Sequence, residues 1–152
     1  MRSRVVLVML CLAAALLSGV AAAASKQTVK DRRGDSKSGV PGNDIVSASA
    51  HFADGRLTFK VTNAKLPKGL HPPCVEIYKG TSVGCTGNAT VETNTRHFKC
   101  KRRTRGNTVT YSFLVRKLGG HPKEVRWRAA IMEGRAADLA PNRGYKRFAF
   151  AP

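Results

Sequence analysis

Acidic residues are scarce in this sequence, and their scarcity dominates its charge. The 152 residues include 9 Asp and Glu against 27 Lys and Arg, which gives a formal net charge of +18. Such an excess favours anionic partners: nucleic acid, acidic polysaccharide, teichoic-acid-like wall polymers or lipid headgroups. The alternative is a basic surface that serves solubility alone.

Arrangements that carry catalysis or zinc binding are also missing. The sequence has no Cys-x-x-Cys pair and its four histidines are scattered, which disfavours a zinc site. It has no Gly-x-Ser-x-Gly elbow for a hydrolase nucleophile. The glutamates fall in different predicted elements, so no acid–base pair stands out. We therefore predict a protein that is not an enzyme.

Only one apolar run is long, and it lies at the amino end. Residues 5–17 are apolar, follow Arg2 and Arg4, and precede small residues ending in Ala22-Ala23-Ala24. This pattern is typical of a secretory signal peptide, and a retained membrane anchor is the less favoured alternative. We predict that residues 1–24 are removed and that residues 25–152 form one secreted or wall-associated domain. Losing two of the 27 basic residues would leave 25 Lys and Arg against 9 Asp and Glu.

Three cysteines follow the predicted signal peptide, an odd number for an exported protein. The local pairings are Cys74–Cys85 and Cys85–Cys100, with one thiol left over or paired between chains. Pro72-Pro73 and the glycines at 80 and 84 indicate a turn that brings the first two together. We therefore favour a Cys74–Cys85 disulfide.

Short segments with a period of two are what the sequence does contain. Residues 46–52 and 56–62 alternate apolar and polar side chains on either side of Asp54-Gly55, which is a strong hairpin signal. Further strands are predicted at 28–31, 74–78, 89–93, 96–100, 108–115, 125–131 and 145–150.

These eight or nine strands, separated by Gly, Pro and Asn and without a helical period, predict an all-β fold. The expected architecture is an antiparallel β-sandwich of jelly-roll-like form. Residues 80–87 and 133–144 are expected to be loops.

Two parts of the chain resemble small exported bacterial β-sandwich proteins, which are commonest in actinobacteria. The first combines DRRGD at 31–35, DIVS at 44–47 and GRLTF at 55–59, and the second combines VRWRA at 125–129 and DLAPNRGY at 138–145. In architecture that group is similar to family-9 carbohydrate-binding modules and DOMON-like domains. The resemblance implies a β-sandwich without enzyme activity. The chain departs from sugar-binding modules because its stacking platforms are limited to three tyrosines and Trp127, which sits at a core-facing position.

Aspartates around the first hairpin are candidate calcium ligands. Asp31, Asp35 and Asp44 lie along a Gly- and Ser-rich loop that can bend around an ion, and calcium takes six to eight oxygen ligands. Asp138 and Asn142 would add oxygens if the first and last strands are neighbours. The alternative is that Asp35 and Asp44 make Asx-turns and that Asp31 pairs with an arginine.

The densest basic run is a candidate polyanion site, and its members are Lys99, Lys101, Arg102, Arg103 and Arg105. Tyr111 and Phe113 follow it, but they share the alternating face of Val109 and so are expected in the core. Without exposed stacking rings a dedicated nucleic-acid site is not predicted. A solvated hairpin tip is the alternative for this run.

Together these features predict a non-catalytic exported module that binds an anionic or carbohydrate polymer of the cell surface. No cofactor other than calcium and no membrane span in the mature chain are expected. The alternative is a structural or protein-interaction domain without a small ligand.

Overall fold

The computed structural model describes residues 25–37, 43–66, 72–78, 81–85, 88–119, 122–133 and 135–150. Its elements are the short 3-10 helix η2 (Val115–Leu118) and the strands β1 (Ser25–Lys30), β2 (Ile45–Ala53), β3 (Arg56–Asn63), β4 (Cys74–Ile77), β5 (Thr81–Val83), β6 (Thr90–Glu92), β7 (His97–Lys99), β8 (Lys101–Arg105), β9 (Thr108–Leu114), β10 (Glu124–Glu133), β11 (Arg135–Ala140) and β12 (Lys146–Ala149). The signal peptide predicted at residues 1–24 lies outside the described residues. Within the described ranges, no helix has the length and apolar character that a membrane crossing requires.

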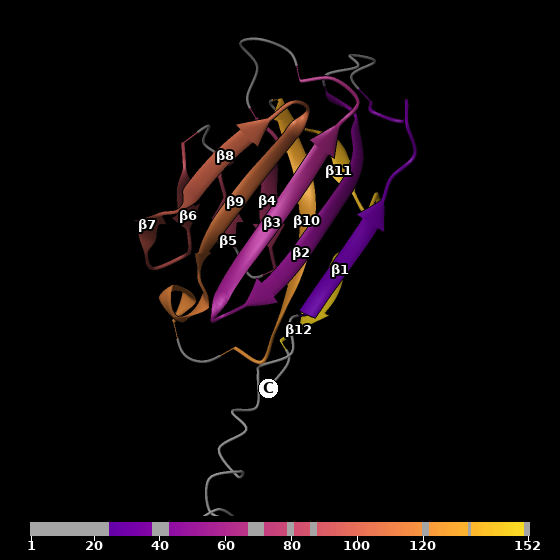
Figure 1. Ribbon diagram of the computed structural model, residues 1–152. Coiled ribbons are helices and arrows are strands. Elements are labelled where there is room, and N and C mark those ends of the chain that lie inside the picture. Colours follow the sequence, from indigo (N-terminus) through magenta and orange to yellow (C-terminus); the bar gives the residue numbers. More distant parts are fainter. Residues whose placement is uncertain are drawn as a thin grey trace, which may run out of the picture.

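The strands form two antiparallel sheets, one in front of the other (Figure 1). The five-stranded sheet has the order β1-β2-β3-β9-β8. The seven-stranded sheet has the order β11-β10-β4-β5-β6-β7, with β12 beside β10. The chain passes between the sheets from β3 to β4, from β7 to β8 and from β9 to β10. This arrangement confirms the predicted antiparallel β-sandwich.

The β2–β3 hairpin is the one that the sequence predicts. Ala53 pairs with Arg56, so Asp54 and Gly55 are the two central residues of the turn. Their φ angles are 50° and 68°, and positive values at both positions belong to a type I′ turn, whose twist matches that of the strands. The inward side chains of β3 are buried and its outward ones are not.

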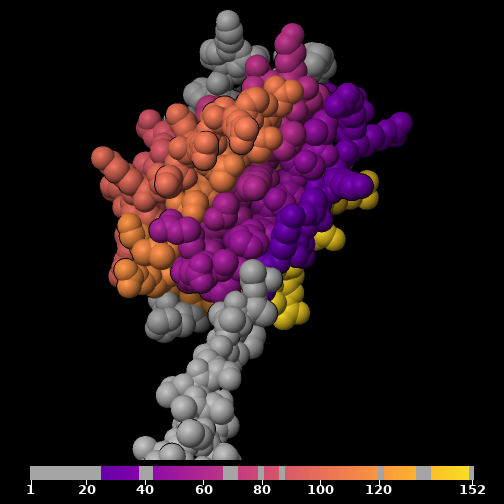
Figure 2. All heavy atoms as spheres, in the orientation of Figure 1, coloured from indigo at the N-terminus to yellow at the C-terminus, as the bar shows by residue number. Residues whose placement is uncertain are grey.

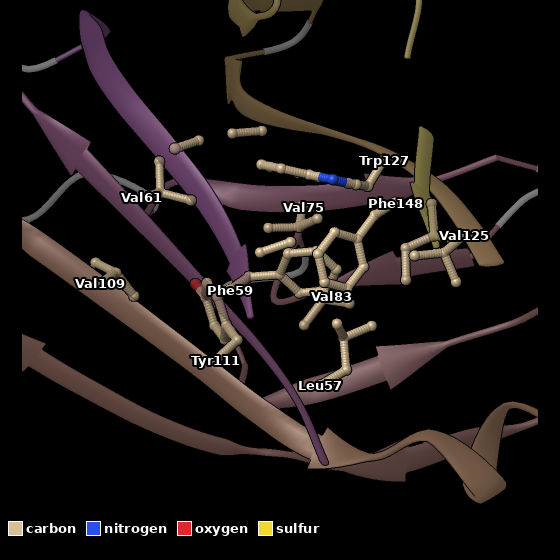
Figure 3. Close-up of a cluster of buried hydrophobic side chains, with 14 of the residues drawn as sticks. Leu57, Phe59, Val61, Val75, Val83, Val109, Tyr111, Val125, Trp127 and Phe148 are labelled. Atoms are coloured by element: carbon tan, nitrogen blue, oxygen red, sulfur yellow. The ribbon is translucent and has the colours of Figure 1, made fainter. Parts of the chain in front are cut away.

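The core lies between the sheets and is centred on aromatic side chains (Figure 3). Phe59 in β3 and Trp127 in β10 are fully buried, and their ring centroids are 5.3 Å apart. The indole Nε1–H of Trp127 donates to Gln27 Oε1 in β1 at 3.1 Å, so its polar atom is satisfied. The prediction that Trp127 belongs to the core is confirmed, and Tyr111 and Phe113 are buried as expected.

Two segments predicted as loops are strands. Residues 81–83 form β5 between β4 and β6, and residues 135–140 form β11 beside β10. With three residues, β5 is too short to show a period, and the alanines of β11 give little hydrophobic contrast. Both loop predictions are therefore wrong, because pairing with a longer neighbour decides the conformation of these segments. The basic segment 101–105, considered above as a hairpin tip, is the exposed edge strand β8.

The predicted Cys74–Cys85 disulfide is confirmed, with the two Cα atoms 4.8 Å apart. It links the start of β4 to the residue that follows Gly84, just beyond β5. Cys100 is a buried free thiol. The bridge leaves this cysteine unpaired, which settles the choice between the two local pairings.

Gly84 lies against the ring of Tyr111 at this point. Its φ angle is +74°, and a Cβ atom added there would stand 2.5 Å from Tyr111 Cε1. The ring cannot retreat easily, because it is fully buried and its hydroxyl donates to Pro73 O at 2.7 Å. Only glycine fits this position.

We predict that Gly84→Ala lowers the free energy of unfolding by about 3 kcal/mol, because overpacking against Tyr111 adds to the strain of a positive φ. Gly106→Ala is the matched control, since Gly106 has a φ of +54° and nothing within 4 Å of its added Cβ. The control should lose only about 1 kcal/mol. Urea unfolding of both variants checks the prediction, and equal losses would contradict it.

Candidate functional site

Outward side chains of the five-stranded sheet form continuous lines across its strands. Residues paired across a sheet share a face. The register pairs Thr28 with Ser49, Ser49 with Lys60, Lys60 with Thr110, and Thr110 with Arg103. One line of polar side chains therefore crosses all five strands.

This outer face, which Figure 2 views from the front, carries basic side chains from three of its strands, β1, β3 and β8. We call it the basic face, and its cations are Lys26, Lys30, Arg56, Lys60, Lys101, Arg103 and Arg105. Within the described part of the sheet, no Asp or Glu stands among them. All charged side chains on the described part of this face are therefore positive.

Hydroxyl groups make up the floor between these cations. Thr62 and Thr108 face each other across β3 and β9 with their hydroxyl oxygens 2.9 Å apart, and Thr58 Oγ1 donates to Ser112 Oγ at 3.1 Å. A shallow hollow of about 510 Å³ spans the face, lined by Thr28, Ser47, Ala48, Ser49, Lys60, Thr62, Arg103, Arg105, Thr108 and Thr110. Hydroxyls beside fixed cations supply additional hydrogen-bond donors for the oxygens of an anion.

The predicted basic run is divided by the fold. Lys101, Arg103 and Arg105 pair with the outward residues of β9 and lie on the basic face. Arg102 pairs with Tyr111 and points away from the basic face. Burial raises the pKa of the Tyr111 hydroxyl to about 12, and the positive charge of Arg102 offsets part of this rise. Lys99 lies in β7 of the other sheet.

The sequence reasoning missed the cations on β1 and β3, namely Lys26, Lys30, Arg56 and Lys60. The signal was present, because residues 56–62 alternate basic and hydroxyl side chains outward with no acidic residue among them. Which strands become neighbours of β3 depends on pairings distant in sequence.

Asp31, Asp35 and Asp138 come together at one end of the sandwich. Each contributes a carboxylate oxygen to a group whose atoms lie within 4.8 Å of one another. Asp138 in β11 reaches across to the other sheet, where its Oδ2 accepts the backbone N–H of Ile45 at 2.6 Å. The first and last parts of the chain are neighbours here, as the metal hypothesis required.

Asn142 contacts the carboxylates of this cluster, whereas Asp44 binds a backbone N–H group of the preceding loop. The amide Nδ2 of Asn142 donates to Asp35 Oδ2 at 2.7 Å and to Asp31 Oδ1 at 3.3 Å. Asp44 is buried, and both of its oxygens accept the backbone N–H of Gly34, at 3.0 and 2.9 Å. Asp44 therefore shapes the loop, in line with the predicted turn role, and Asp31, Asp35 and Asp138 form the oxygen-rich centre.

Negative charge in this centre is poorly compensated. Asp31 Oδ2 and Asp35 Oδ1 are buried and accept no hydrogen bond from the described residues. Burial, with the neighbouring charges of Asp35 and Asp44, raises the pKa of Asp31 to about 6. Burial also raises the pKa of Asp138 to about 6, although the backbone N–H groups of Ile45 and Leu139 donate to this carboxylate and lower its pKa in part. Chemically, the centre offers hard oxygen ligands of the kind that divalent cations prefer.

The alternative of an Asp31–arginine pair finds no support in the part of the chain that the structure describes. The ion pairs between described residues are Arg128 with Glu76 and Arg147 with Glu124, and both lie on the seven-stranded sheet.

Comparison of the chain with protein-family models, with curated proteins and with solved structures found no match. The resemblance to exported β-sandwich proteins and sugar-binding modules therefore stays a prediction.

Without divalent cations, stability should fall as the pH rises from about 4 to about 6. The folded-state pKa values of Asp31 and Asp138 are about 6, against an ordinary 3.8, so over this range the folded chain holds protons that the unfolded chain has lost. This stabilising contribution is complete below pH 4 and disappears as the pH passes 6.

Urea unfolding in EDTA at several pH values measures the effect against Asp31→Asn, which cannot ionise. Over this pH range the variant should gain stability relative to the wild type. The control Gly106→Ala, which changes no titratable group, should keep a constant difference. A constant difference for Asp31→Asn as well would refute the prediction.

Proposed function

We propose that this protein is a non-catalytic module that binds an anionic polymer on the basic face. The observation that carries the proposal is a sheet face of several strands with many cations and no acidic side chain among its described residues. A surface of one sign raises the local concentration of oppositely charged ligands and guides their approach.

The spacing of the cations suits a chain with repeated charges. Lys101, Arg103 and Arg105 alternate along β8, so their Cα atoms are about 7 Å apart, at about 3.4 Å per residue. Lys60 and Lys26 continue the cationic surface across β3 and β1. An extended polymer can therefore contact several cations at once, each releasing a condensed counterion.

The shape of the face also favours a polymer over a small molecule. Pockets for small ligands are concave and enclose most of the ligand. Here the hollow of about 510 Å³ is shallow and is lined by residues of all five strands. A phosphate or sulfate group lying in it would meet Lys60 and Arg103 together with the hydroxyls of Thr62 and Thr110.

We predict that the domain binds long-chain polyphosphate with an affinity that falls steeply with salt. Lys60→Gln with Arg103→Gln removes two cations that are distant in sequence but share the face. Their loss should make the slope of log K against log salt shallower by about 1.4, since each contact with a single-stranded polymer contributes about 0.7. Fluorescence anisotropy over a salt series measures both quantities.

The matched control is Arg96→Gln with Lys99→Gln, which removes the same charge from exposed positions near β7 and in it. Its slope should remain that of the wild type. Equal losses in the two double variants would mean that net charge, and not the face, governs binding. An absence of binding even at low salt would leave the basic residues only a solubility role, and the proposal would fail.

We also propose that the Asp31–Asp35–Asp138 centre binds a divalent cation, for which calcium is the best match. The supporting observation is the pair of buried carboxylate oxygens without hydrogen-bond donors, Asp31 Oδ2 and Asp35 Oδ1. Such atoms cost free energy unless a donor or a cation meets them. The Asn142 amide now bridges Asp31 and Asp35 with its nitrogen, and rotation of that amide would present its oxygen to an ion instead.

We predict that calcium raises the melting temperature of the mature domain relative to EDTA. At 100 times the dissociation constant the expected stabilisation is about 2.7 kcal/mol. Asp138→Asn should abolish the shift, because it removes a ligand charge, and Asp54→Asn should keep it. Thermal melts at pH 7.5 are the measurement. A shift of equal size in both variants, or none in the wild type, would exclude the site.

A further inference from the structure

A second line of outward side chains crosses the five-stranded sheet, and it contains a histidine. The register pairs Lys26 with His51, His51 with Thr58, Thr58 with Ser112, and Ser112 with Lys101. The line therefore has a lysine on each edge strand, β1 and β8, and an imidazole between them. His51 lies on β2, a strand that contributes no lysine or arginine to the basic face.

A hollow of about 250 Å³ lies at this histidine, lined by Lys26, Ser49, His51, Thr58 and Lys60. His51, Ser49 and Thr58 are half-buried, whereas the two lysines are exposed. The hollow thus gathers ammonium and hydroxyl donors around one imidazole. These donors suit the oxygens of a single phosphate or sulfate group.

The charged side chains that face His51 from the neighbouring strands are all basic. On β1, Lys26 is its direct partner, and on β3, Lys60 and Arg56 stand two positions to either side of the residue that pairs with it. The carboxylate of Asp54 belongs to the β2–β3 turn, beyond the last pair of that hairpin. Among the described residues of the face, no carboxylate can pair with a protonated His51, so the partner for its charge is a bound anion.

We propose that this hollow is a subsite for one anionic group of the polymer, and that His51 binds the group as an imidazolium. Histidine is the side chain that gains positive charge as the pH falls from about 8 to about 5. Both of its ring nitrogens are then donors, so proton uptake adds a charge and a donor to the middle of the line. The affinity of the basic face for a polyanion therefore rises at acidic pH. This inference rests on the proposed function and names the residue that regulates it.

The test compares polyphosphate binding by the wild type and by His51→Gln in EDTA, using fluorescence anisotropy over a salt series at pH 5.5 and pH 8.0. At pH 5.5 the wild-type slope of log K against log salt should be steeper than that of the variant by about 0.7, because one further cation contacts the polymer. This difference corresponds to about fivefold tighter binding at about 0.1 M salt. At pH 8.0 the two slopes should coincide. The charges of Asp31 and Asp138, whose pKa values are about 6, change in both proteins and so cancel in the comparison.

Two further variants separate charge from other effects of the substitution. His51→Lys places a permanent cation in the hollow, so its slope should exceed that of His51→Gln by about 0.7 at both pH values. His97→Gln is the matched control, because it removes an exposed histidine from β7 of the other sheet. It should keep the pH dependence of the wild type.

Proton uptake can also be observed directly, because binding and protonation are reciprocal. Imidazole 1H–15N spectra of the labelled domain at pH 6.5 report the protonated fraction of each histidine. Polyphosphate should raise this fraction for His51 and leave that of His97 unchanged.

The outcomes distinguish this inference from the function on which it rests. Equal slopes for the wild type and His51→Gln at pH 5.5, or a His51 signal that polyphosphate does not change, would overturn the inference. The polyanion function would survive that result if Lys60→Gln with Arg103→Gln still weakens binding. A His51→Lys variant that binds like His51→Gln would also overturn the inference, since a charge in the hollow would then contact nothing. If the wild type binds no polyphosphate at either pH, the proposed function fails and the inference fails with it.

Discussion

The packing of Phe59 against Trp127 is the contact on which the other features depend. It joins the middle of β3 to the middle of β10, with 5.3 Å between the two ring centroids, and both side chains are fully buried. Since successive side chains of a strand point to opposite faces, burying Phe59 turns Lys60 to solvent, and burying Trp127 turns Arg126 and Arg128 outward. Both outer surfaces therefore follow from one core contact. A slip of one residue in either strand would bury charge and expose an aromatic ring.

The few carboxylates are sorted by the fold into separate places. Asp31, Asp35 and Asp138 meet at one end of the sandwich, and Glu76 and Glu124 pair with arginines on the seven-stranded sheet. On the described part of its outer face, the five-stranded sheet is left with cations as its only charged side chains, beside uncharged hydroxyl groups. Three surfaces of different charge result: the basic face, the carboxylate centre, and the outer face of the seven-stranded sheet, where carboxylates and arginines stand together. Their differences arise from the grouping of charges, which net charge alone does not reveal.

The local features were predictable where one stretch of chain contains the whole signal. The Asp54-Gly55 turn needs two residues with positive φ between alternating runs, and Trp127 lies in such a run between arginines that point outward. The short strand β5 has no comparable signal, because its conformation comes from its neighbours β4 and β6. Among the proposed site residues, the linear basic run was misleading: alternation sends Arg102 to the opposite face from Arg103.

What the sequence by itself determined is therefore the set of properties with a short range. These are the all-β class, the β2–β3 hairpin, the inward side of each long strand and the excess of positive charge, because each depends on residues a few positions apart. The tertiary structure alone decided which outward rows lie side by side and which carboxylates meet. Lys60 joins Arg103 across β9, and Asp138 joins Asp31, only through pairings distant in sequence. Such pairings are selected by packing of the whole core, and no short segment encodes them.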